Sequence, residues 1–445
     1  MRKVRTLARG LVARVLTAGG VLALVLAHGL QAHSSVPSAT ATRIKHVVII
    51  LKENRSFDHY FGRLPGVRGA SSGLIHTGER VSLVKPPDPF PHDVGHSTSG
   101  WHKAWDNGKM DGFDLESTPT TDTGLLLPYT SMRESQIPSY WAYARKYAIG
   151  DRFFSPWKGP SFANNMFSVA GQAGQFDTTN GRKVIYDVPF NLQHEPVAGN
   201  YWGCDSPAGT LVRMEAPGGS ISTQFPCFNY RGLPNVLANH GVSWKFYTPG
   251  SKNDIHNALD ALKPVRYDAS LWKNIAYLGQ FYTDAADASL PNVAWVNGRS
   301  SEHPPYTACA GENETVQIVN ALMNGPNWNS TVVFVYWDEW GGMYDHVPPP
   351  SGYGFRVPFL VISPWTKHGA LSNGGYVTHT FYSVPSIHAF IEHNWSLPSL
   401  TPLDAAANNL LDAFDFTQLG RGKLLRPTRT CNPPPANVKI TDGEA

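Results

Sequence analysis

The chain alternates short apolar runs with segments whose apolar residues recur at helical spacing. The clearest run, at residues 44–51, contains successive valines and isoleucines without a turn residue. We also predict strands over residues 242–247, 292–296, 331–336 and 356–362. Continuous β-branched runs are typical of strands that are buried on both faces of a parallel sheet.

Helical patterns separate these runs. We predict helices over residues 140–147, 233–240, 314–324 and 382–393, and one more helix that begins at Ser161. Strands that alternate with helices indicate a mostly parallel central sheet with helices on both faces. The predicted fold class is therefore α/β, as one large domain with long loop insertions.

Three stretches depart from this alternation. Residues 63–137 are rich in glycine, proline and serine, and so long an irregular segment is usually functional. Residues 172–232 carry two cysteines and many glycines and prolines, which predicts an insertion over the sheet. Residues 423–445 are predicted to form an extended, proline-rich tail, so the main domain is expected over residues 42–422.

The N-terminus has the composition of a secretory signal. Five basic residues precede an apolar run at residues 21–27, and small and polar residues follow it. We predict a signal over residues 1–32, with cleavage between Ala32 and Ala41. An uncleaved anchor is the alternative, but glycines leave the apolar stretch short for a bilayer. Removing these five of the 37 basic residues leaves 32 against 34 acidic ones, so no nucleic-acid footprint remains.

The four cysteines fit export to an oxidising compartment. Three pairings are possible. We favour Cys204 with Cys227, which closes a short loop, and Cys309 with Cys431, which ties down the tail. No Cys-x-x-Cys pair occurs, so a zinc knuckle or redox dithiol is not expected. The predicted location is secreted, periplasmic or at the cell envelope.

Oxygen-bearing side chains stand where two predicted strands end. Glu53 and Asn54 follow the first strand, and Asp338 and Glu339 follow the strand at residues 331–336. Open α/β sheets bind ligands at the carboxyl ends of their strands, and such a set of oxygen donors suits a hard divalent cation. The alternatives are a helix cap for the first pair and a solvated turn for the second.

A serine hydroxyl is predicted at the start of a helix. Ser161 follows Gly159 and Pro160 and precedes a helical run. A helix N-terminus presents free backbone N–H groups, which hold a phosphoryl group. Contact with a metal would lower the pKa of the hydroxyl and make it a nucleophile. The alternative is that Ser161 only caps the helix.

Four of the 17 histidines lie beside acids in loops rich in proline and glycine. An imidazolium in such a place can bind phosphate or protonate a leaving oxygen. A single histidine is more often structural, so only these four are selected. They are His92, His96, His303 and His346.

Taken together, these segments resemble the phosphoesterase family of bacterial phospholipases C and acid phosphatases, which has an alkaline-phosphatase-like fold. The resemblance extends from about Lys45 to about Trp395. Its motifs follow one another in the family's order. They are residues 53–62, 159–161, 301–304 and 338–350.

The resemblance implies roles for the strand-end residues. Ser161 stands at the position of the family's serine or threonine nucleophile, which is also a metal ligand. One divalent cation is implied, whether calcium, magnesium, manganese or zinc. Its implied ligands are Glu53, Asn54, Ser161, Asp338 and Glu339.

The remaining roles concern the substrate. The resemblance implies that His96, His303 and His346 contact phosphate, and His303 is the leading candidate for the proton donor. We also assign candidate substrate-binding roles, which fall on His92, Asn164 and Asp345.

Two departures from the family pattern affect substrate preference. The turn after the nucleophile usually reads Pro-Asn-Arg but is Ala-Asn-Asn over residues 163–165, and Trp340 replaces a histidine of the phospholipase branch. The motifs around residues 336–350 still favour that branch, with phosphatidylcholine as substrate and transient membrane contact. Phosphate monoesters are the alternative. An apolar mouth is expected from Trp101, Trp105, Trp157 and Trp340.

Two other functional classes fit less well. An α/β-hydrolase esterase requires a Gly-x-Ser-x-Gly elbow, and none occurs. A non-catalytic protein that binds lipid or glycan on the same scaffold would have lost acid or serine positions, and all are present. The sequence therefore predicts a metal-dependent phosphoric ester hydrolase with no obligate protein partner.

Overall fold

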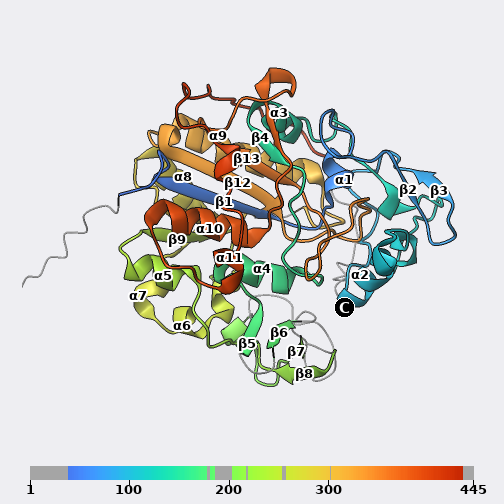
Figure 1. Ribbon diagram of the computed structural model, residues 1–445, viewed down its shortest axis with the longest axis horizontal. Helices are drawn as coiled ribbons and strands as arrows, with labels where there is room; N and C mark the ends of the chain where they lie inside the picture. The colour runs from blue at the N-terminus through green and yellow to red at the C-terminus, as the bar shows by residue number, and fades with distance from the viewer. Residues whose placement is uncertain are drawn as a thin grey trace, which may run out of the picture. The chain divides into compact units, whose positions relative to one another are not determined.

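The computed structural model describes residues 39–177, 181–185, 203–216, 219–252, 257–300 and 302–433, so the predicted signal lies outside the described residues. The centre of the described chain is an eight-stranded sheet with the order β10-β9-β11-β1-β12-β13-β4-β14 (Figure 1). Its strands are β1 (His46–Lys52), β4 (Ala148–Gly150), β9 (Trp244–Thr248), β10 (Ile275–Tyr277), β11 (Val293–Val296), β12 (Thr331–Trp337), β13 (Phe359–Ile362) and β14 (Tyr376–Thr378).

The sheet is mostly parallel, as the sequence predicts. β1 pairs in parallel with β11 on one side and with β12 on the other, whereas β13 runs antiparallel to both of its neighbours. Every residue of β12 is buried, and so is every residue of β1 after His46. Burial on both faces explains why these strands read as unbroken apolar runs.

The strand register places the candidate residues at one edge of the sheet. Lys52 pairs with Trp337, so β1 and β12 end at the same level. β11 lies on the other side of β1 and runs in the same direction. The segments that follow these three strands therefore begin side by side.

Helices cover both faces of the sheet. Figure 1 shows α3 and α9 on one side and α4 and α10 on the other. α9 begins at Ala308, earlier than predicted, because the Thr307 hydroxyl accepts a hydrogen bond from the Cys309 N–H and caps the helix there. The longer helices are α1 (Phe57–Phe61), α2 (Thr98–Trp105), α3 (Pro138–Lys146), α4 (Ser161–Ala170), α5 (Leu233–Asn239), α8 (Leu278–Ala286), α9 (Ala308–Asn324) and α10 (Val384–Trp395).

A separate antiparallel sheet falls within the predicted insertion. Its strand order is β5-β6-β7-β8, and β6 contacts α4. Residues 186–202 of the predicted insertion lie outside the described residues. The strands are β5 (Gly174–Asp177), β6 (Gly181–Ile185), β7 (Val212–Glu215) and β8 (Ile221–Gln224).

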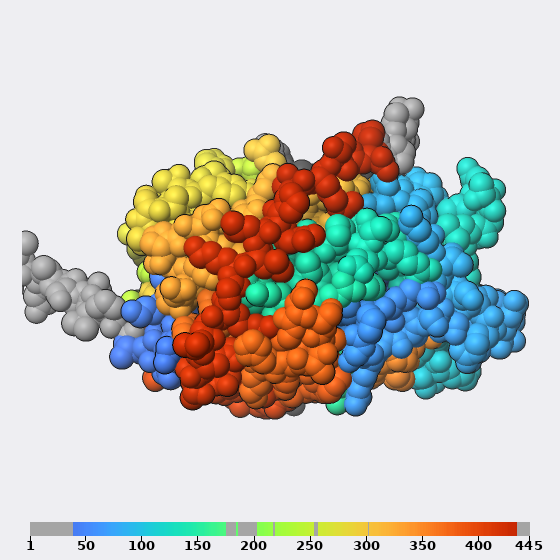
Figure 2. Space-filling view, turned by 90° about the horizontal axis from the view of Figure 1, so that it is seen from above, coloured from blue at the N-terminus to red at the C-terminus, as the bar shows by residue number. Residues whose placement is uncertain are grey.

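Both predicted disulfides are confirmed. One joins Cys204 to Cys227 and the other joins Cys309 to Cys431. The described part of the C-terminal tail is irregular, and it is held on α9 because Asn313 bonds to the Arg429 backbone. Figure 2 shows this segment, in red, crossing one face of the molecule. Among the described helices, none combines the length and the apolar character that crossing a membrane requires.

Candidate active site

Asn54 joins the ends of the two central strands. Its backbone N–H donates to Asp338 Oδ1 at 3.1 Å. Asn54 has a φ of 64°, in the left-handed region, and Gly341 lies against it with a φ of 61°. A Cβ on Gly341 would stand 2.4 Å from the Asn54 carbonyl oxygen, so only glycine leaves room for this turn. Backbone strain of this kind is concentrated at functional sites.

The Asn54 side chain connects two further segments. Its Nδ2 donates to His96 Nε2 at 3.0 Å, and its Oδ1 accepts from Ser161 Oγ at 3.4 Å. His96 Nδ1 lies 2.6 Å from the Val94 carbonyl, so Nδ1 carries the proton and Nε2 is the acceptor. That tautomer sets the orientation of the amide and turns its oxygen toward Ser161. Three candidate residues from three distant segments are thus in direct contact.

The acids beside Asn54 are buried. Asp338 and Glu339 have no exposed surface, and Glu53 is 8% exposed. Asp338 Oδ1 also accepts from the Glu339 N–H at 2.8 Å, and Glu339 Oε1 lies 3.9 Å from His96 Nε2. Since both acids are buried, the solvated turn is excluded.

The alternative capping roles are also excluded. Ser56, not Glu53 or Asn54, caps α1, because its hydroxyl accepts from the His59 N–H. Pro160 occupies the cap position of α4, so Ser161 is the first helical residue. Proline offers no side-chain oxygen for the free N–H groups of the first turn, and these groups attract an anion.

Asn164 shapes the turn that carries Ser161. Its Oδ1 accepts from the Trp157 N–H at 3.0 Å, and its Nδ2 donates to the Gly159 carbonyl at 2.8 Å. The amide therefore ties α4 to the loop before it. This contact fixes the approach of the chain to Ser161.

A pair of histidines lies at the centre of the site. The rings of His96 and His303 meet edge to face, with centroids 5.4 Å apart. His303 Nδ1 lies 2.5 Å from the Pro304 carbonyl and donates to it, so Nε2 is the nitrogen that can exchange a proton. Asp93, which the sequence reasoning did not select, joins this pair: one ligand atom from each residue lies within 4.8 Å of the others. The adjacent His-Asp-x-x-His pattern was the available signal.

His92 and Glu116 occupy the same loop region. The His92 ring nitrogens lie 2.9 Å from the Asp93 carbonyl and 3.2 Å from the Thr120 carbonyl, so His92 contacts backbone within the described part of the chain. Glu116 is buried, and burial raises its pKa to about 8 against the opposing charges of His96 and Lys103. Glu116 could not be selected from the sequence, because its burial depends on the tertiary packing.

Aromatic residues pack against His96 and against one another. Trp340 packs edge-on against His96, with centroids 6.4 Å apart, and against Phe355 at 5.2 Å. Trp101 stacks on Phe355 at 5.3 Å. Trp101 and Trp340 are buried, so they contribute to a packed core, while Trp105 and Trp157 are half-buried.

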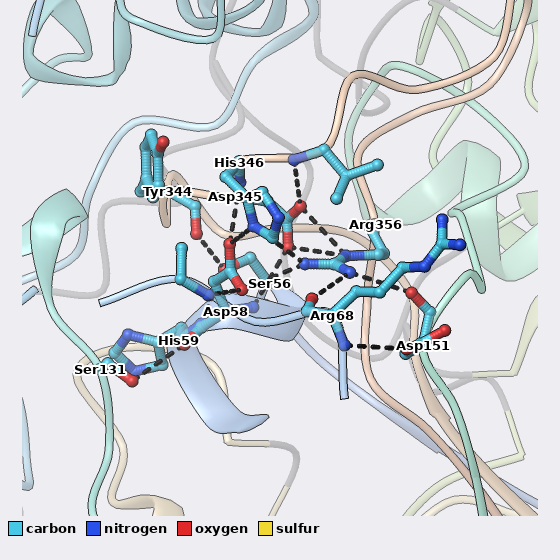
Figure 3. Close-up of polar contacts among 12 residues, drawn as sticks. Ser56, Asp58, His59, Arg68, Ser131, Asp151, Tyr344, Asp345, His346 and Arg356 are labelled. Atoms are coloured by element: carbon cyan, nitrogen blue, oxygen red, sulfur yellow. Dashed lines mark hydrogen bonds and ion pairs between the residues drawn. The ribbon is translucent and has the colours of Figure 1, made fainter. Parts of the chain in front are cut away.

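A second polar cluster, shown in Figure 3, lies on the segments that follow β1 and β12. Arg356 Nε lies 3.1 Å from both carboxylate oxygens of Asp345, and Arg356 Nη2 donates to Asp58 Oδ1 at 3.1 Å. His346 Nδ1 lies 2.6 Å from Asp58 Oδ2. We name Asp58, Asp345, His346 and Arg356 the arginine cluster. The structure thus places Asp345 and His346 on Arg356, not against Asn54.

The arginine cluster is close to electrical balance. Burial lowers the pKa of His346, but the hydrogen bond to Asp58 and the charges of Asp58 and Asp345 outweigh it, so the pKa is raised. A protonated His346 and Arg356 together offset the two carboxylates. The guanidinium occupies the space between the acids.

The residues around Asn54 fit a divalent cation. Carboxylate, amide and hydroxyl oxygens are the donors that hard cations take. Buried carboxylates are costly unless positive charge offsets them, and a bound cation would supply that charge. Asn54 contacts Asp338 and Ser161, the Glu339 N–H donates to Asp338, and Glu53 is the buried residue before Asn54. The residues that would hold the cation are Glu53, Asn54, Ser161, Asp338 and Glu339.

Comparison with known proteins shows a family match over most of the chain and relatives that share about a quarter of its residues. Residues 44–398 match the model of the Phosphoesterase family. The non-hemolytic phospholipases C of Burkholderia pseudomallei and Pseudomonas aeruginosa are each 26% identical, over 88% and 90% of this chain and 62% of their own lengths. Phospholipase C A of Mycobacterium tuberculosis is 26% identical over 84% of this chain and 78% of its own length. This chain spans about three fifths of the first two relatives, and it belongs to the Phosphoesterase family.

Proposed function

We propose that this protein is a metal-dependent phosphoric ester hydrolase with Ser161 as its nucleophile. The observation that carries the proposal is the contact between Ser161 Oγ and Asn54 Oδ1, where β1 and β12 end together. Membership of the Phosphoesterase family supports the reaction class.

The strand-end oxygens would hold the cation. When bound, a divalent cation lowers the pKa of the serine hydroxyl and offsets charge on a phosphoryl group. His96 and Asn54 orient the serine, because the fixed tautomer of His96 turns the amide oxygen toward Ser161. The N–H groups of the first turn of α4 favour the phosphoryl oxygens.

The bond changes follow from this arrangement. Ser161 gives its hydroxyl proton to solvent, its Oγ attacks phosphorus in line, and the bond from phosphorus to the leaving oxygen breaks. His303 Nε2 gives a proton to the leaving alcohol. Water then attacks the phosphoserine, and His303 takes a proton from that water. The bond from phosphorus to Ser161 Oγ breaks, and Oγ takes a proton back from solvent.

The substrate we propose is a phospholipid such as phosphatidylcholine, which yields diacylglycerol and phosphocholine. The names of the relatives, phospholipases C, support this choice. A phosphate monoesterase is the second candidate, since Trp340 and residues 163–165 depart from the phospholipase pattern. Two disulfides support action outside the cytoplasm. Transient contact with lipid is part of the proposal, because a phospholipid substrate lies in a membrane.

The test compares two substrates and two serines of one helix. Release of diacylglycerol from phosphatidylcholine and of nitrophenol from an aryl phosphate is measured with purified protein and added divalent metal. Ser161→Ala should lose activity by several orders of magnitude. Ser168→Ala is the matched control, because Ser168 is also buried in α4 but its hydroxyl donates to the Asn165 carbonyl of the same helix.

Each outcome decides the proposal. Activity that disappears with Ser161→Ala, survives Ser168→Ala and returns when metal is restored after chelation supports it. Full activity in folded Ser161→Ala, or in metal-free wild type, rejects it. The ratio of the two rates separates phospholipase from monoesterase.

A further inference from the structure

Glu302 occupies a strained backbone position beside His303. Its φ is 81°, in the left-handed region that residues with a Cβ rarely adopt. The side chain is fully buried. Strain of this kind persists only where surrounding contacts enforce it.

Four donors from four elements surround the Glu302 carboxylate. The hydroxyl of Tyr60 on α1 donates to Oε2 at 2.5 Å, and the indole N–H of Trp337 on β12 donates to the same oxygen at 3.2 Å. The hydroxyl of Tyr140 on α3 donates to Oε1. Lys52, at the end of β1, places its Nζ 3.6 Å from Oε1. Both oxygens therefore accept at least two contacts.

The positions of these partners in the chain explain why the cluster matters. Lys52 directly precedes Glu53, Trp337 directly precedes Asp338, and Glu302 directly precedes His303. The carboxylate of the residue before His303 thus contacts the residues that directly precede two other candidate site residues, Glu53 and Asp338. A shift of this carboxylate would change the spacing between the strand-end acids and the histidine.

Gly311 and Lys52 pack closely around the Glu302 side chain. A Cβ on Gly311 of α9 would lie 2.0 Å from Glu302 Cγ, so the helix approaches closely only through glycine. Lys52 is 2% exposed, and its Nζ also contacts the Ser300 and Gly311 carbonyls, which joins the end of β1 to the loop before Glu302. Burial raises the pKa of Glu302, while Lys52 and the two tyrosine hydroxyls act against that shift.

We infer that Glu302 is a positioning residue, whose buried carboxylate holds the His303 loop against the ends of β1 and β12 so that His303 meets the leaving oxygen. This inference rests on the proposed function, in which His303 is the proton donor. Glu302 itself touches no substrate.

The test uses the leaving group as its readout. A misplaced acid slows esters whose alcohol leaves poorly, whereas a nitrophenyl ester needs little protonation. The parameter compared is kcat/KM, which reports the step that releases the alcohol and not the later hydrolysis of the phosphoserine. For Glu302→Gln we expect kcat/KM for an alkyl phosphate ester to fall about tenfold to a hundredfold, and kcat/KM for the nitrophenyl ester to fall no more than about threefold.

Asp284→Asn is the matched control. Asp284 is also a buried carboxylate that binds a lysine and a tyrosine, because Lys245 Nζ and Tyr247 OH both donate to its Oδ2 at 2.5 Å. Lys245 and Tyr247 lie on β9, so this change should lower the thermal midpoint and leave the ratio of the two kcat/KM values unchanged.

A second variant covers the case in which Glu302→Gln does not fold. Tyr140→Phe removes one donor to Oε1 and keeps the ring, and it should shift the kcat/KM ratio in the same direction by a smaller factor. An unchanged ratio in the folded variant, or equal losses on both esters, overturns the inference while the proposed function stands. Wild type without ester hydrolysis, or active Ser161→Ala, would instead reject the proposed function.

Discussion

The segments that follow β1 and β12 carry two buried polar clusters, one around Asn54 and the arginine cluster. The two clusters differ in the groups that lie beside their carboxylates. Around Asn54, the acids lie beside an amide, a hydroxyl and an imidazole. In the arginine cluster, Asp58 and Asp345 face the guanidinium of Arg356. Acids that share a guanidinium are already neutralised, so their role is to hold the two segments together. Acids that face neutral oxygen and nitrogen donors retain the charge that a cation can use.

Asp338→Asn should give the largest effect on the reaction. We expect kcat to fall about a thousandfold, since a metal-bound centre contributes several kcal/mol. Asp345→Asn is the control in the arginine cluster and should cost stability but much less activity. Steady-state kinetics and isothermal titration with Mg²⁺ or Ca²⁺ check this. Equal losses of activity and of metal affinity in both variants would contradict the proposal that only the acids around Asn54 bind the cation.

Arg356→Met should give the largest effect on stability. It leaves two buried carboxylates without their cation, and removing one partner of a buried ion pair costs about 3 kcal/mol or more. Urea unfolding followed by circular dichroism measures the loss. A variant as stable as wild type would show that Asp58 and Asp345 do not depend on the guanidinium, against the role given to this cluster.

The pH dependence of His346 should give a smaller effect. Its pKa in the folded protein is raised above the ordinary value of 6.5, so its stabilising contact is complete below that value and is lost as pH rises through the raised pKa. Because His346 is partly exposed, we expect less than about 1 kcal/mol. Unfolding of wild type and His346→Gln well below and well above pH 6.5 measures this difference. A stability gap that widens toward high pH would contradict the ion pair with Asp58.

Much of the fold could be predicted because burial leaves a continuous signal. β1 and β12 read as unbroken apolar runs, and their parallel pairing at one edge follows from general rules. Short elements were missed. β4 and β14 are three residues long, and their pairing joins residues far apart in the chain. The direction of β13 is also set by tertiary packing, so the pattern alone did not reveal it.

The candidate site was predictable only in part, for a physical reason. The acids after β1 and β12 could be selected as candidates because the ends of parallel strands meet at one edge of the sheet. The sequence could not show that Arg356 lies between Asp58 and Asp345. An aspartate has the same appearance in a sequence whether its partner in the folded chain is a metal ion, an arginine or water. Glu302 was missed as well, since its four donors come together only in the folded chain.

The stereochemical course at phosphorus tests the central claim most directly. A phosphate ester that is chiral at phosphorus through isotopic or sulfur labelling is hydrolysed, and the configuration of the product is determined. Attack by Ser161 followed by attack of water makes two inversions, so the account predicts overall retention. Overall inversion would mean that water attacks the substrate in one step, which would contradict Ser161 as the nucleophile.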